Sequence, residues 1–69
     1  MKLRLCAAED LATGEMVIGL AGGYDECTVI KVDPNPVNRR FCDMTVYLKD
    51  GGEAVLTVPA EALMQALQP

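Results

Sequence analysis

The side chains best suited to chemistry in this chain of 69 residues are the thiols of Cys6, Cys27 and Cys42. A catalytic thiol needs a base to ionise it, and structural zinc needs four Cys or His ligands. The chain has no histidine and no serine, its cysteines are widely spaced, and acidic residues adjoin Cys27 and Cys42. Because neighbouring carboxylates raise the pKa of a thiol, we expect no enzymatic activity, no metal and no cofactor. Each cysteine is predicted to be a small buried hydrophobe.

The adjacent arginines Arg39 and Arg40 could bind an anion. Two guanidinium groups in a proline-containing loop can hold a carboxylate or phosphate through paired hydrogen bonds, and Phe41 can stack beside them. The alternative is that both are solvated loop charges. Binding to nucleic acid would require the six basic residues to gather on one face, whereas ten acidic residues are spread among them and the net charge is −4. The composition therefore disfavours a nucleic-acid partner.

A few aromatic side chains could contribute to recognition of a cation. Tyr24 and Tyr47, with Asp25 or Glu26 beside them, could form part of a wall around a cationic side chain. The alternative is that Tyr47 is an ordinary surface residue and Phe41 fills the core.

Acidic residues gather in predicted loops of the N-terminal part, at Glu9, Asp10, Glu15, Asp25 and Glu26. We interpret them as a solvated rim. Such a rim could also imitate a phosphate backbone and occupy a basic groove on another protein.

Alternation of polar and apolar residues predicts that these side chains are positioned mainly by strands. The expected strands cover residues 2–7, 16–20, 27–32, 42–49 and 53–58. In the first, Leu3, Leu5 and Ala7 are expected on one face and the charged residues on the other. The last two are predicted to form a hairpin, because Asp50-Gly51 supplies the positive φ angles of a tight turn. Gly19 suggests a bulge, and residues 8–15 a compact loop ending in a tight turn at Gly14.

The C-terminal segment is predicted to be a short helix over about residues 59–67. Pro59 suits the first helical turn, and Glu61 places negative charge near the positive end of the helix dipole. Apolar residues recur at helical spacing, at Ala60, Leu63, Met64 and Leu67. Part of this stripe is expected to contact a second copy or a partner, with Met64 as an adaptable contact.

The order of these elements resembles the SH3-like and Tudor-like small β-barrels. The resemblance covers roughly residues 13–63 and rests on Thr13-Gly14-Glu15-Met16-Val17-Ile18-Gly19, on Tyr24 in a glycine-rich loop, and on the strand–Asp50-Gly51–strand hairpin. It implies a mainly β fold, a five-stranded antiparallel barrel, to which the C-terminal helix is added. Members of that superfold commonly bind peptides, methylated side chains or nucleic acid.

The length predicts one domain over residues 1–69 with a small aliphatic core. Cores of this size usually need a disulfide, a metal or a partner subunit for extra stability, and the first two are disfavoured here. Three cysteines without an apolar leader run suggest reduced thiols and a cytoplasmic protein, and no apolar stretch is long enough to cross a membrane. We therefore expect a non-enzymatic protein–protein interaction or assembly module that self-associates or binds a protein partner. The alternatives are an acidic inhibitor of a nucleic-acid-binding groove and, third, a nucleic-acid-binding barrel that uses Arg39 and Arg40.

Overall fold

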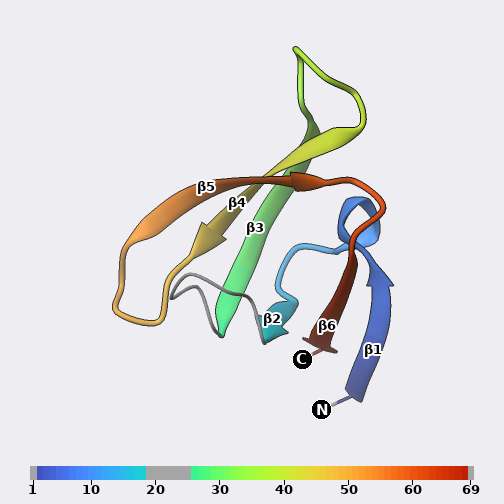
Figure 1. Ribbon diagram of the computed structural model, residues 1–69. Coiled ribbons are helices and arrows are strands. Elements are labelled where there is room, and N and C mark those ends of the chain that lie inside the picture. The colour runs from blue at the N-terminus through green and yellow to red at the C-terminus, as the bar shows by residue number, and fades with distance from the viewer. Residues whose placement is uncertain (1, 19–25, 69) are drawn as a thin grey trace.

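The computed structural model describes residues 2–18 and 26–68, which form a six-stranded antiparallel sheet. Its strand order is β1–β6–β2–β3–β4–β5, so β1 and β5 lie at the two edges and the last strand of the sequence lies between the first two (Figure 1). The elements are β1 (Lys2–Ala7), the 3-10 helix η1 (Ala8–Asp10), β2 (Met16–Ile18), β3 (Cys27–Pro34), β4 (Phe41–Tyr47), β5 (Glu53–Pro59) and β6 (Leu63–Gln68).

The expected five-stranded barrel with a C-terminal helix is wrong, although the mainly β composition is found. The chain turns after β5, where the Pro59 carbonyl accepts a hydrogen bond from the Ala62 N–H, and residues 63–68 then form β6. A helix of two turns is marginal in water, whereas a strand at this position has hydrogen-bonding neighbours on both sides. The sheet remains open because β1 and β5 are not paired with each other.

The β4–β5 hairpin is confirmed, with a wider turn than the sequence suggested. The strands pair from Phe41 opposite Pro59 to Tyr47 opposite Glu53. The Leu48 N–H donates to the Gly52 carbonyl at 2.6 Å, which closes a loop over residues 49–51. Only Gly51 in this loop has a positive φ, at +100°, so the turn is a three-residue loop with one left-handed residue rather than a two-residue primed turn.

The core lies on one face of the sheet, as alternation in β4 predicted. Cys42, Met44 and Val46 are buried, and Cys27 and Val29 of β3 pack with them. The prediction that cysteines fill the core is therefore confirmed for Cys27 and Cys42. The other buried hydrophobic residues of this cluster are Ala8, Leu11, Val17, Ala60, Met64 and Ala66. A register shift between Val29 and Lys31 marks a bulge in β3; the bulge predicted at Gly19 lies outside the described residues.

The two faces predicted for β1 are found, and the face of the strand that carries the leucines is the outer one. Leu3 and Leu5 are 58% and 61% exposed, while Cys6 packs against the core. Arg4 lies on the inner face and forms an ion pair with the buried Glu15. A strand can turn only one face inward, so the inward placement of Arg4 and Cys6 puts both leucines outside.

Candidate functional site

An open groove of about 280 Å³ is lined by Arg39 and Phe41, two of the residues that the sequence singled out for anion binding. It lies where β3 ends and β4 begins, beside η1. Its lining residues are Glu9, Val32, Asp33, Pro34, Arg39, Phe41, Cys42 and Ala60. A second hollow of about 570 Å³ shares part of this lining and adds Arg40, Pro59 and Glu61. The structure thus brings Arg39, Arg40 and Phe41 to one depression, which we call the arginine groove.

Two asparagines shape the loop that carries these arginines. The Asn35 Oδ1 accepts the backbone N–H groups of Val37 and Asn38, both at 2.9 Å, and its Nδ2 donates to Asp43. The Asn38 Oδ1 accepts the Arg40 N–H at 3.0 Å. These bonds satisfy the backbone of a loop in which prolines supply no donors.

The arginine groove contains charges of both signs. The side chains of Arg39 and Arg40 form no hydrogen bond or ion pair with any described residue. Glu9, Asp33 and Glu61 contribute carboxylates to the same lining. This mixture suits a peptide segment with both charges better than the uniformly negative backbone of nucleic acid.

The other predicted contact residues do not gather in this groove. Tyr24 and Asp25 lie outside the described residues, so the proposed aromatic wall is not described. The Glu26 carboxylate pairs with the Lys49 ammonium at 2.7 Å, and Tyr47 is exposed on β4. Met64 lies on β6 in the core, 7% exposed, and therefore offers little surface to a partner.

The thiols have environments that disfavour the reactive thiolate. Burial, with smaller effects from Glu9 and Asp43, raises the pKa of Cys42 above its usual value. Burial likewise raises the pKa of Cys6. Among residues 2–18 and 26–68, no three His, Cys, Asp or Glu side chains are placed to hold a metal ion.

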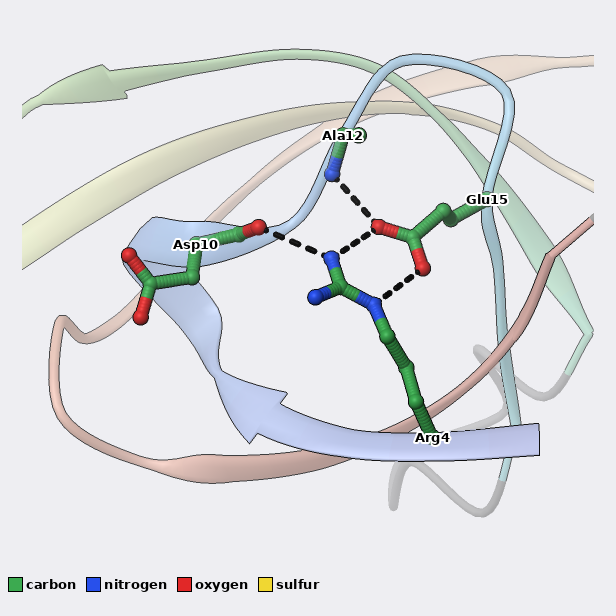
Figure 2. A network of polar contacts seen from close by, with 4 residues as sticks. All are labelled: Arg4, Asp10, Ala12 and Glu15. Atoms are coloured by element: carbon green, nitrogen blue, oxygen red, sulfur yellow. Dashed lines mark hydrogen bonds and ion pairs between the residues drawn. The ribbon is translucent and has the colours of Figure 1, made fainter.

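The sequence did not reveal an ion pair between the half-buried Arg4 and the buried Glu15 (Figure 2). The Arg4 Nε donates to Glu15 Oε2 at 2.7 Å, its Nη2 donates to Oε1, and the same Nη2 donates to the Asp10 carbonyl at 3.0 Å. The Ala12 N–H also donates to Oε1, at 2.7 Å. The cluster ties β1 to the loop that precedes β2.

This cluster corrects the interpretation of Glu15 as part of a solvated acidic rim. Glu15 is 2% exposed, and the hydrogen bonds from Arg4 lower the pKa of its carboxyl to about 2 despite the opposing effect of burial. Glu15 follows Gly14, whose φ of +93° confirms the predicted tight turn. The turn directs the carboxylate inward, and only the distant Arg4 neutralises it, so no local pattern could reveal the pair.

An exposed apolar surface covers the outer side of β1 and β6. Leu3 stands opposite Leu67, and Ala7 stands opposite Leu63, which is 70% exposed. Residues directly opposite in a sheet share a face, so Leu3, Leu5, Leu63 and Leu67 lie on one side of the sheet, which we call the leucine face. The exposed Gln65 stands opposite Leu5 on the same side. The leucines of β1 were not predicted to be exposed here, because leucines at alternating positions normally mark the core.

Comparison with protein-family models, with curated proteins and with solved structures finds no match to this chain. The residues described by the structure include no helix with the length and apolar character needed to traverse a bilayer.

Proposed function

We propose that the chain is a non-enzymatic protein–protein interaction or assembly module, and that its contact surface is the leucine face together with the adjoining edge of β1. One observation carries the proposal: three leucines, Leu3, Leu5 and Leu63, remain more than half exposed on neighbouring strands at an edge of the sheet. Large apolar side chains exposed together at one edge of a sheet are typical of interaction sites in small soluble proteins.

The energetics favour coverage of this surface. Burying one exposed leucine side chain is worth up to about 1.5–3 kcal/mol, which is large beside the stability expected of a domain with so small a core. The unpaired edge of β1 adds backbone donors and acceptors that an added strand would satisfy.

The distribution of basic residues supports a protein partner over nucleic acid. Arg4 pairs with Glu15, Lys31 with Asp33 and Lys49 with Glu26. Half of the six basic residues are thus neutralised by carboxylates, and such cations contribute little to phosphate binding.

Site-specific photocrosslinking tests the proposal. A photoreactive residue placed at Leu63 should crosslink to protein when the chain is produced in its native cells. The matched control is Val37, which is 93% exposed but lies in the loop between β3 and β4, away from the leucine face. Crosslinking at Leu63 well above that at Val37 would support the proposal, and equal or weaker crosslinking at Leu63 would refute it.

A further inference from the structure

The free edge of β1 can be assigned residue by residue. The Ala8 N–H donates to the Ala62 carbonyl at 2.9 Å, directly beyond the pairing of Ala7 with Leu63. In an antiparallel ladder, hydrogen-bonded pairs alternate with non-hydrogen-bonded pairs. Residues 2, 4 and 6 therefore direct their backbone groups to β6, and Leu3, Leu5 and Ala7 direct theirs to the open edge.

The same residues of β1 present unpaired backbone groups and exposed apolar side chains. Leu3 and Leu5 have their backbone groups at the open edge and their side chains on the leucine face. An added strand would thus gain main-chain hydrogen bonds and apolar contacts together. Beyond β1 the chain stays bonded on the β6 side, where the Ala8 N–H donates to the Ala62 carbonyl and the Glu9 N–H to the Ala60 carbonyl.

The two edges of the sheet differ in how well they are protected against pairing with another strand. The β5 edge ends in Pro59 and begins with the charged Glu53, both of which discourage pairing with another strand. The β1 edge contains no proline, and Lys2 is the charged residue on it that has no ion-pair partner among the described residues.

Resting on the proposed function, we propose that the partner is a second copy of this chain, bound by antiparallel pairing of the two β1 strands about a two-fold axis. Leu5 stands opposite Leu5 of the second copy, and Leu3 stands opposite its Ala7. Each of these pairs joins residues whose backbone groups face the open edge. The leucine faces of the two copies become one continuous surface across a twelve-stranded sheet, twice the six strands of one copy.

Charge disfavours a neighbouring register that also keeps the leucines on one side. A shift of two residues that brings Leu3 opposite Leu5 of the second copy also places Arg4 opposite Arg4, which is unfavourable. In the proposed register Arg4 stands opposite Cys6 of the second copy, and like charges do not meet.

The ends of the paired strands are complementary. Lys2 stands opposite Ala8 of the second copy, next to the acidic Glu9 and Asp10 of its η1. The Asp10 carboxylate lies on the far side of its residue from the Arg4 guanidinium, so it is available for this contact (Figure 2). Two-fold symmetry repeats the interaction at the other end.

Sedimentation velocity over a concentration series tests the association. One strand pair with its leucines is a small interface, so we expect a dimer that dissociates on dilution. Leu5→Glu places two carboxylates opposite each other and should abolish the dimer, whereas Val37→Glu, an equal charge change on the exposed loop, should leave it intact. Circular dichroism checks that both variants fold. A wild-type monomer at all concentrations, or a dimer that survives Leu5→Glu, would overturn the inference.

Disulfide trapping tests the register. In the proposed pairing the Leu5 Cα atoms of the two copies are about 5.5 Å apart, within range of a disulfide. Leu5→Cys should therefore form a covalent dimer under mild oxidation. Leu3→Cys should not, because its counterpart is about four residues away along the strand, roughly 13 Å. Wild type controls for the native cysteines, and trapping by Leu3→Cys in preference to Leu5→Cys would refute the register.

A charge exchange tests the complementary ends. Lys2→Glu should raise the dissociation constant of the dimer by about tenfold at low salt, and combining it with Glu9→Lys and Asp10→Lys should restore the affinity. Absence of this rescue would contradict the proposed contact. A monomeric protein that still crosslinks to other proteins through Leu63 would refute self-pairing while leaving the proposed function standing. A monomeric protein that also fails to crosslink through Leu63 would refute the self-pairing and the proposed function together.

Discussion

Arg4 and Glu15 stand eleven residues apart in the sequence, and the guanidinium of one donates two hydrogen bonds to the carboxylate of the other. The two ends of this ion pair differ in access to water: Glu15 is 2% exposed, whereas the Arg4 side chain is 33% exposed. If Glu15 is removed, the Arg4 guanidinium can be hydrated by solvent. If Arg4 is removed, the Glu15 carboxylate stays buried without water. The pair should therefore respond unequally to loss of either member.

We predict that Arg4→Met destabilises the fold more than Glu15→Gln does. The first leaves a buried carboxylate without its main partner, while the second leaves an arginine that can turn to solvent and an amide that can still accept the Ala12 N–H. Glu15→Gln should cost about 1–3 kcal/mol of unfolding free energy, the range for losing hydrogen bonds to a buried charged group. Urea unfolding measures both variants, and a larger loss for Glu15→Gln would contradict the asymmetry.

We predict that the contribution of Glu15 to stability disappears in acid. The folded state holds the pKa of this carboxyl at about 2, below the ordinary value of 4.5, so the unfolded chain binds more protons between these values. The stabilisation is complete above about pH 4.5 and is lost as the pH falls to about 2. The stability difference between wild type and Glu15→Gln should therefore shrink over this range. Glu61→Gln, an equal charge change at an exposed site, is the control, and a difference that stays constant with pH would refute the prediction.

We predict opposite tolerances at the neighbouring positions Leu63 and Met64. In β6 Leu63 points to the exposed leucine face and Met64 to the core. Met64→Gln should cost about 2–4 kcal/mol, because it replaces packed apolar surface with an amide that has no partner there. Leu63→Gln should change the unfolding free energy of the monomer by less than about 0.5 kcal/mol. Chemical denaturation in dilute solution compares them, and comparable losses would support a helical stripe instead of a strand.

We predict that two adjacent glycines of the hairpin loop differ in their response to alanine. Gly51 has a φ of +100°, and a Cβ there would meet only the Tyr47 hydroxyl, at 3.8 Å. The cost of Gly51→Ala is therefore conformational, about 1–2 kcal/mol. Gly52 lies outside the left-handed region and would make ordinary contacts at 3.6 and 3.8 Å, so Gly52→Ala should be neutral or slightly stabilising. Thermal unfolding of the two variants checks this, and equal melting temperatures would contradict it.

The β4–β5 hairpin could be predicted because its information is local. Cys42, Met44 and Val46 alternate with polar residues, and glycines follow directly at the turn. The partner strand is the next one in the sequence, so alternation and turn chemistry specify the same structure.

The local sequence could not predict which face of β1 is buried, or that residues 63–68 form a strand and not a helix. Alternation in β1 predicts a strand but does not say which face is inward, and the inward position of Arg4 depends on Glu15 in another element. In β6 both faces carry apolar residues, since Met64 and Ala66 pack in the core while Leu63 and Leu67 belong to the leucine face. Such a sequence also satisfies helical spacing, and only pairing with β1 and β2 decides between the two.

The arginine groove was anticipated in part. Arg39, Arg40 and Phe41 are consecutive, so their proximity follows from the sequence. Their association with Glu9 and Glu61 does not, because these come from η1 and from the turn after β5. The mixed charge of the groove is thus a property of the tertiary structure.

The position of β6 between β1 and β2 has a consequence for biosynthesis. A nascent chain must carry β1 without a neighbour while the residues up to β6 leave the ribosome, and the half-sheet can close only when the final strand slides into the gap. During that interval the backbone groups of residues 2, 4 and 6, which later pair with β6, would be accessible to chaperones.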